Sequence, residues 1–170
     1  MKHILRISAQ SDRVVSLLLM LCSLGLLLSA FILEWWLTLE PCPMCELQRI
    51  LLATLVLILG LRLIFWNFVG LRNRLRTLLL LLLIIGSALA ARQTYLQYHP
   101  ELVGDTCLPG LAMIYSLGGW WEVAKIFWYG SSQCAKISFQ VYGITIPGML
   151  SVCYIFMLGL YVRFTQKFNR

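Results

Sequence analysis

The chain has 170 residues, of which 60% are hydrophobic and 12% are charged, and its net charge is +7. This composition excludes an ordinary soluble domain, because such domains carry about 25% charged residues. It predicts an integral membrane protein, since about 20 apolar residues in a helix cross the roughly 30 Å hydrocarbon core of a bilayer. The basic residues are not clustered with aromatic residues, which argues against a nucleic-acid-binding surface.

Four long apolar stretches predict an all-α membrane protein, a bundle of four transmembrane helices in a single domain. They lie at about residues 14–33, 47–66, 76–92 and 143–162. Residues 1–13 are polar and basic, a beginning that is also typical of a signal peptide. The apolar run that follows exceeds the roughly 7–15 residues of a signal peptide, so we expect the first helix to be retained.

Three polar segments connect these helices. Residues 34–46 form a short loop, residues 67–76 a tight basic hairpin and residues 93–142 a long loop. Within the long loop, Leu111–Tyr129 is rich in tryptophan, carries charges and is interrupted by Gly118-Gly119. This mixture predicts a short amphipathic helix that lies in the membrane interface. A folded loop with its own aromatic core is the alternative.

The charges divide unequally between the two sides of this bundle. One side carries Lys2, Arg6, Arg13, Arg62, Arg72, Arg74, Arg76, Arg163, Lys167 and Arg170 with the single acid Asp12, and the other carries Arg49, Arg92, Lys125 and Lys136 with six acids. Because basic residues accumulate on the cytoplasmic side of membrane proteins, we expect both termini to be cytoplasmic. The short and the long loop then lie on the opposite, oxidising side.

A Cys-x-x-Cys pair, Cys42 and Cys45, opens the second predicted helix and is followed by Arg49. The pKa of a cysteine falls near a helix N-terminus, near a cation and within such a pair. If the helix begins near Glu46, Arg49 lies one turn beyond Cys45 on the same face. The pattern predicts a redox-active dithiol.

Two further cysteines, Cys107 and Cys134, lie in the long loop on the same side as the dithiol, whereas Cys22 and Cys153 fall inside predicted helices and are expected to be packing residues. Two structural disulfides are one alternative. A four-cysteine zinc site is another, although 26 residues separate the loop cysteines and zinc ligands usually come in close pairs. A Cys-x-x-Cys bridge closes too small a loop to stabilise a fold strongly, which favours redox chemistry without a metal.

A dithiol beside the bilayer needs an electron acceptor. The membrane offers a lipid-soluble quinone, and a bundle with Arg49 at the dithiol end offers a place for its head group. Two disulfides would form a relay, in which an external thiol reduces one and thiol–disulfide exchange passes the electrons to the other. The longer loop suits the outer member of the relay, which must reach a protein partner.

Five short motifs stand in a distinctive order on this framework. They are Cys42-x-x-Cys45 with Arg49, Arg92-Gln93-x-x-x-Gln97, Cys107-Leu-Pro-Gly-Leu111, Gly130-Ser-Ser-Gln-Cys134-Ala135 and Gly143-Ile-Thr-Ile-Pro147. Together they resemble the bacterial disulfide-bond formation protein B family over roughly residues 14–162. The resemblance implies a protein dithiol:quinone oxidoreductase of the bacterial inner membrane. Its cofactor would be ubiquinone or menaquinone, and its partner a periplasmic DsbA-like protein of the thioredoxin fold.

The resemblance also implies a role for each cysteine. The partner would attack Cys107 to form a mixed disulfide, Cys134 would exchange with Cys42, and Cys45 would become the thiolate that faces the quinone. A quinone-linked reductase similar to vitamin K epoxide reductase is a further alternative. In that family the loop cysteines precede the Cys-x-x-Cys pair, whereas here they follow it.

Two arginines and one glutamine complete the implied site. Arg49 matches the arginine that the family places beside the quinone, and Arg92 is either a second quinone-site residue or an interfacial residue whose side chain reaches toward the headgroups. Gln48 stands where some members have an acidic residue. The resemblance also leads us to expect a tryptophan in the region after Cys134 and another after Pro147, and both are missing.

Overall fold

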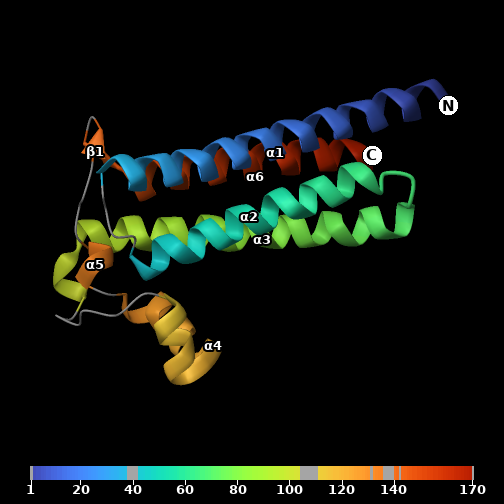
Figure 1. Ribbon diagram of the computed structural model, residues 1–170. Helices are drawn as coiled ribbons and strands as arrows, with labels where there is room; N and C mark the ends of the chain where they lie inside the picture. The colour runs from blue at the N-terminus through green and yellow to red at the C-terminus, as the bar shows by residue number, and fades with distance from the viewer. Residues whose placement is uncertain are drawn as a thin grey trace.

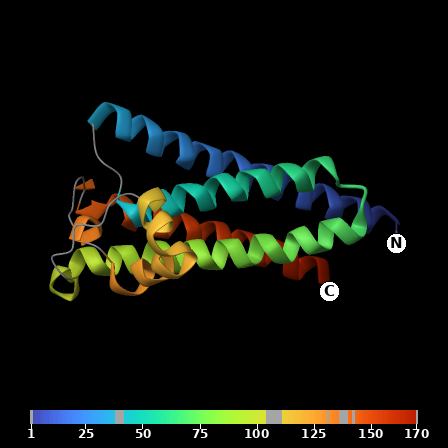
Figure 2. The ribbon, with the colours of Figure 1, turned by 60° about the horizontal axis from the view of Figure 1, so that its bottom comes forward.

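The computed structural model describes residues 2–37, 42–103, 111–130, 132–135, 140–141 and 143–169. Within these ranges, four helices are long and apolar enough to span a membrane: α1 (Lys2–Leu37), α2 (Pro43–Ile64), α3 (Val69–Tyr98) and α6 (Ile146–Asn169). They run side by side in an elongated bundle (Figures 1 and 2). The predicted four-helix membrane bundle is therefore confirmed.

The two ends of the bundle differ. Both termini and the turn between α2 and α3 lie at one end, which we call the terminal end (Figure 1). The smaller elements lie at the other, the loop end: a 3-10 turn (Pro100–Leu102), α4 (Leu111–Tyr129), α5 (Ser132–Ala135) and the strands β1 (Gln140–Val141) and β2 (Ile144–Thr145). A helix is thus present where the amphipathic one was expected, as α4, with a kink at Gly118 and Gly119. Its place in the membrane interface stays a prediction.

All four spanning helices begin at positions other than the predicted ones, and α1 begins at Lys2, so the polar residues before the predicted start at residue 14 are helical as well. α2 begins at Pro43, earlier than expected, because proline has no N–H to lose and its fixed φ suits the first helical turn. α3 begins at Val69, so most of the expected hairpin 67–76 is helical; arginine and leucine are good helix formers, and hydropathy does not separate a polar helix from a loop. α6 begins only at Ile146, because β1 and β2 pair around Gly143, whose φ of 80° suits a tight hairpin turn.

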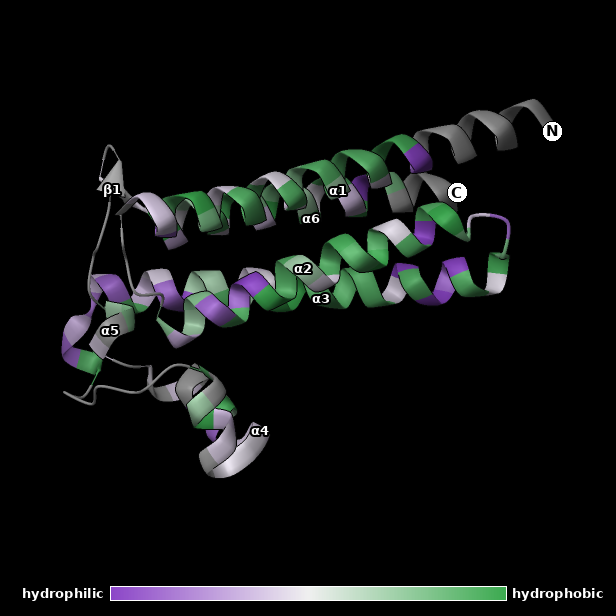
Figure 3. Ribbon diagram, in the orientation of Figure 1, coloured by the Kyte–Doolittle hydropathy of each residue, from purple (hydrophilic) through white to green (hydrophobic). Residues whose placement is uncertain are grey.

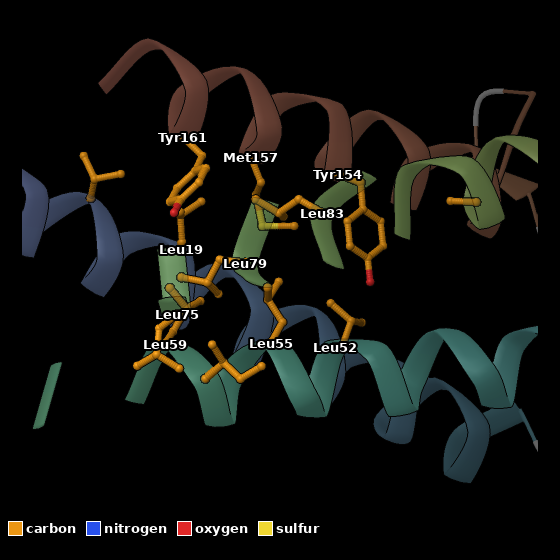
Figure 4. Packing of buried hydrophobic residues seen from close by; sticks show 13 residues of the cluster. Leu19, Leu52, Leu55, Leu59, Leu75, Leu79, Leu83, Tyr154, Met157 and Tyr161 are labelled. Atoms are coloured by element: carbon orange, nitrogen blue, oxygen red, sulfur yellow. The ribbon is translucent and has the colours of Figure 1, made fainter. Parts of the chain in front are cut away.

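The core lies between leucines of α1, α2 and α3 and three larger side chains of α6. Figure 4 shows Tyr154, Met157 and Tyr161 of α6 pointing toward Leu19, Leu52, Leu55, Leu59, Leu75, Leu79 and Leu83. The outward faces of the same helices are also apolar: Leu57 and Phe156, for example, are 62% and 64% exposed. Apolar residues cover the middle of the long helices, and polar ones gather toward their ends (Figure 3). Lipid chains would cover such outward faces in a membrane.

Helices α3 and α6 approach each other closely at Gly86. A methyl group at this position would lie 2.4 Å from Cε1 of Tyr154, which is itself only 1% exposed. Small residues allow this close approach of membrane helices.

We therefore expect Gly86→Ala to lower the free energy of unfolding by about 1–3 kcal/mol, the usual effect of overpacking a core. Gly60→Ala is the matched control, because a methyl group there meets nothing within 4 Å. Denaturant unfolding in detergent micelles measures both. Equal stability of the two variants would contradict the tight contact.

A buried ion pair joins α1 and α2 at the terminal end. Nη2 of Arg62 donates to both carboxylate oxygens of Asp12, at 2.9 and 2.8 Å. The Arg62 side chain is 1% exposed, and its guanidinium lies 5.9 Å from the ring centroid of Tyr161. Arg62 is therefore turned into the bundle, where Asp12 neutralises its charge.

Candidate redox site

The first turn of α2 places two thiols face to face. Cys42 is the N-cap residue, and its Sγ accepts a hydrogen bond of 3.3 Å from the backbone N–H of Cys45. The two Sγ atoms are 2.8 Å apart, and both cysteines are free thiols. The earlier start of α2 thus puts Cys45 inside the helix, where its own N–H orients the sulfur of Cys42.

A third thiol reaches the same place from the long loop. Directly after α4 stands Gly130, whose φ of 70° favours glycine and where a methyl group would lie 2.7 Å from Cδ1 of Leu96 on α3. This close approach sets α5 against α3, and Cys134 of α5 is 1% exposed and within hydrogen-bonding reach of Cys42. Cys107 lies outside the described residues. The structure therefore brings together three of the four cysteines that the sequence singled out.

Apolar side chains enclose the thiols. The buried cluster contains Cys42, Met44, Leu89, Leu96, Ile114, Val123 and Cys134. Hydrogen bonding to Cys134 and to Cys45, followed by burial, raises the pKa of Cys42 above its usual value. Cys42 therefore keeps its proton, and a negative charge on the dithiol resides on Cys45.

Gln93 of α3 places its side-chain amide within hydrogen-bonding distance of both sulfurs. Its Nε2 donates to Sγ of Cys45 at 3.0 Å and lies 3.4 Å from Sγ of Cys42, and the residue is 1% exposed. An N–H donor stabilises a thiolate more than a thiol. In the sequence, Gln93 stands out only as part of the motif Arg92-Gln93-x-x-x-Gln97. The signal that marks it is its spacing from Gln97, since two glutamines four residues apart share one face of a helix.

Three glutamines at this end of the bundle carry buried polar atoms without a hydrogen-bond partner among the described residues. These atoms are Nε2 of Gln48, Oε1 of Gln93 and Oε1 of Gln97. Leaving such an atom unpaired costs about 1–3 kcal/mol, so groups of them are uncommon. Their occurrence here favours a polar ligand that supplies the missing partners.

Arg49 links α2 to α1 beside the dithiol. Its guanidinium pairs with the carboxylate of Glu34, donates to the carbonyl oxygen of Ala30 at 3.3 Å and lies 5.2 Å from the ring centroid of Phe31. The side chain is 19% exposed. Glu34 therefore offsets the positive charge that the sequence analysis assigned to this position.

Arg92 links α3 to α4 through a hydrogen bond. Its Nη2 donates to the carbonyl oxygen of Trp128 at 2.7 Å, near the C-terminal end of α4, where a cation is favourable. The guanidinium also lies 5.7 Å from the ring centroid of Tyr95. These contacts assign Arg92 a place at the junction of α3 and α4.

Four spanning helices with a buried dithiol at one end define a multi-pass membrane oxidoreductase of the thiol–disulfide type. The family model described as disulfide bond formation protein DsbB matches residues 12–163. The chain belongs to this family, as its motifs indicated, and its general role is in protein disulfide bond formation.

Relatives of the same description cover most of the chain. The disulfide bond formation protein B of Marinobacter nauticus is 33% identical over 158 residues, which are 88% of this chain and 89% of the relative. The protein of the same name from Polaromonas naphthalenivorans is 36% identical over 146 residues, 84% of this chain and 86% of the relative. Disulfide bond formation protein B 1 of Pseudomonas aeruginosa is 31% identical over 153 residues, 88% and 91% of the two chains. No solved structure matches.

Proposed function

We propose that the protein reoxidises a periplasmic DsbA-like dithiol oxidase of the thioredoxin fold and passes the electrons to a quinone of the bacterial inner membrane. The observation that carries this proposal is the meeting of Cys42, Cys45 and Cys134 at the N-terminus of a spanning helix. This meeting matters because thiol–disulfide exchange needs sulfurs that can reach one another. Membership of the disulfide bond formation family is a second support.

The distribution of charge supports an orientation with the loop end in the periplasm. Described basic residues at the terminal end include Arg13, Arg72, Arg74 and Arg76, and the acid Asp12 is already paired with Arg62. By the positive-inside rule this end, with both termini, faces the cytoplasm. The thiols then face the compartment in which disulfides persist.

The first half of the cycle opens the loop disulfide and joins Cys134 to Cys42. A thiolate of the reduced partner attacks Cys107 in a Cys107–Cys134 disulfide, so that a partner–Cys107 bond forms and Cys134 leaves as a thiolate. Cys134 then attacks Cys42 in a Cys42–Cys45 disulfide. A Cys42–Cys134 bond forms and Cys45 leaves as a thiolate, with Gln93 donating an N–H to its sulfur.

The second half restores the loop. The second thiolate of the partner attacks the partner–Cys107 bond, and the oxidised partner leaves Cys107 as a thiolate. Cys107 attacks Cys134 in the Cys42–Cys134 disulfide, which rebuilds the loop bridge and releases Cys42. Each exchange conserves electrons, so the partner's two electrons end on the reduced dithiol Cys42/Cys45.

The residues near the dithiol fit a quinone. Nε2 of Gln48 is a free donor for a ring carbonyl, and Oε1 of Gln93 and of Gln97 are free acceptors for the hydroxyls of the reduced ring, among the described residues. A quinone bound there supplies the acceptor for two electrons and two protons. The ion pair of Arg49 and Glu34 is polar but carries no net charge, which suits the uncharged ring of a quinone.

Trapping of a mixed disulfide tests the assigned point of attack. A reduced partner that lacks its second active-site cysteine cannot release itself, so we expect a nearly stoichiometric adduct on Cys107 of the oxidised protein. Mass spectrometry of non-reduced peptides locates it, and Cys107→Ser is the control that should form none. An adduct on Cys42 or Cys45 in place of Cys107 would contradict the proposed order of exchange.

A further inference from the structure

One carboxylate joins the dithiol turn to the beginning of α4. Oε2 of Glu46 accepts a hydrogen bond of 2.8 Å from the backbone N–H of Leu111, the first residue of α4. Glu46 directly follows Cys45 in α2, and its own backbone N–H donates to the carbonyl oxygen of Cys42 at 3.1 Å. The same residue therefore contacts both the redox turn and the long loop.

The chemistry of this contact makes it a strong one. The first N–H groups of a helix have no partner within the helix, and the positive end of the helix dipole favours a carboxylate there. Hydrogen bonds to an ionised group are roughly twice as strong as neutral ones. Ile114 and Val123 of α4 pack in the buried cluster with Met44, so α4 is held by an apolar face and by Glu46 at its N-terminal end.

The sequence then ties Cys107 to this contact. Cys107 stands four residues before Leu111, and four extended residues span at most about 14 Å. Because Glu46 holds the N–H of Leu111 next to the dithiol turn, the covalent chain limits the distance between Cys107 and that turn. A released loop lowers the effective concentration of Cys107 at its target, because that concentration falls steeply when the connecting chain is freed.

We propose that Glu46 is a positioning residue, which holds the start of α4 so that Cys107 returns quickly to the dithiol. The proposal rests on the function proposed above and concerns one step of it. In that step Cys107 attacks Cys134 of the Cys42–Cys134 disulfide; the Cys107–Cys134 bond forms, the Cys42–Cys134 bond breaks, and Cys42 leaves and takes up a proton. The attack of the partner on Cys107 does not depend on Glu46.

Rapid-quench peptide mapping of Glu46→Leu and Glu46→Gln separates these steps. In Glu46→Leu, which has no acceptor, we expect the Cys42–Cys134 peptide to accumulate during turnover and the rate to fall about tenfold, in keeping with the loss of a hydrogen bond to an ionised group. Glu46→Gln keeps an acceptor oxygen at the same place and is expected to stay within about threefold of the parent. Glu101→Leu removes an exposed acid of the same loop and should leave the rate unchanged.

Two outcomes would overturn the role of Glu46: no accumulation of the Cys42–Cys134 peptide in Glu46→Leu, or a Glu46→Gln variant as slow as Glu46→Leu. Trapping of the single-cysteine partner on Cys107 is measured in the same variants. Normal trapping without accumulation rejects the role of Glu46 and leaves the proposed function standing. A failure to trap in the parent protein rejects both.

Discussion

Replacing Cys45 with serine is expected to reduce oxidation of the thioredoxin-like partner to the uncatalysed rate, a loss of at least about a thousandfold. Cys42 then has no neighbouring sulfur in the first turn of α2 with which to form a disulfide. In the proposed cycle a Cys107–Cys134 disulfide can still oxidise partner molecules once, so a burst of at most one equivalent should precede the arrest. Stopped-flow assay of partner oxidation, with quinone reduction followed in parallel, measures the burst and the steady rate.

The matched controls are the two cysteines inside spanning helices. Cys22 lies on α1 and Cys153 on α6, and neither belongs to the thiol cluster. Serine at either position should leave turnover intact. Repeated turnovers by Cys45→Ser would mean that the dithiol is structural, as in a scaffold whose disulfides hold loops.

Replacing Gln93 with leucine is expected to slow reoxidation of the dithiol about ten- to hundredfold, the range for losing a hydrogen bond to a charged group. Leucine fills a similar volume but offers no N–H to the Cys45 sulfur, which the amide approaches to 3.0 Å. The pH at which the reduced dithiol is alkylated at half its maximal rate should rise, because the thiolate loses its donor. Iodoacetamide labelling across pH, read by mass spectrometry, measures this shift.

Thr94→Val provides the comparison on the next residue of α3. The Thr94 hydroxyl donates to the carbonyl oxygen of Ala90 at 2.8 Å and meets the Ser151 hydroxyl at 3.3 Å, so it serves helix packing. Its alkylation profile should match that of the parent protein. If Gln93→Leu also matches the parent, the amide does not stabilise the thiolate.

The sequence predicted the number and order of the spanning helices because hydropathy reports directly on transfer into lipid. It also predicted the interruption of α4 at Gly118-Gly119, because glycine is a weak helix former and readily adopts a positive φ such as the 63° of Gly119. It placed the starts of α2, α3 and α6 differently, because a polar helical turn and a loop have the same hydropathy. The fit of Pro43 to a first turn decides the start of α2, and the strand pairing around Gly143 decides the start of α6.

The cysteines could be identified from the sequence because their chemistry is specific, but the contacts that Gln93 and Glu46 make around them could not. Gln93 and Glu46 act across gaps between helices, and such contacts depend on the rotation of each helix about its axis. Arg49 shows the same limit of prediction. Its position beside the dithiol was expected, whereas its ion pair with Glu34 of α1 depends on how the helices pack.

The ion pair at the terminal end fixes the position of α2 relative to α1. Each helical residue advances the chain by about 1.5 Å, so Cys45 lies roughly 26 Å beyond Arg62 along the axis of α2. That length nearly equals the roughly 30 Å hydrocarbon layer. Because Asp12 of α1 holds Arg62 inside the bundle, α2 resists sliding along α1. Under the proposed function, this spacing sets the sulfurs and the ion pair about one hydrocarbon layer apart, so that an oil-soluble oxidant and a water-soluble reductant can both reach the dithiol.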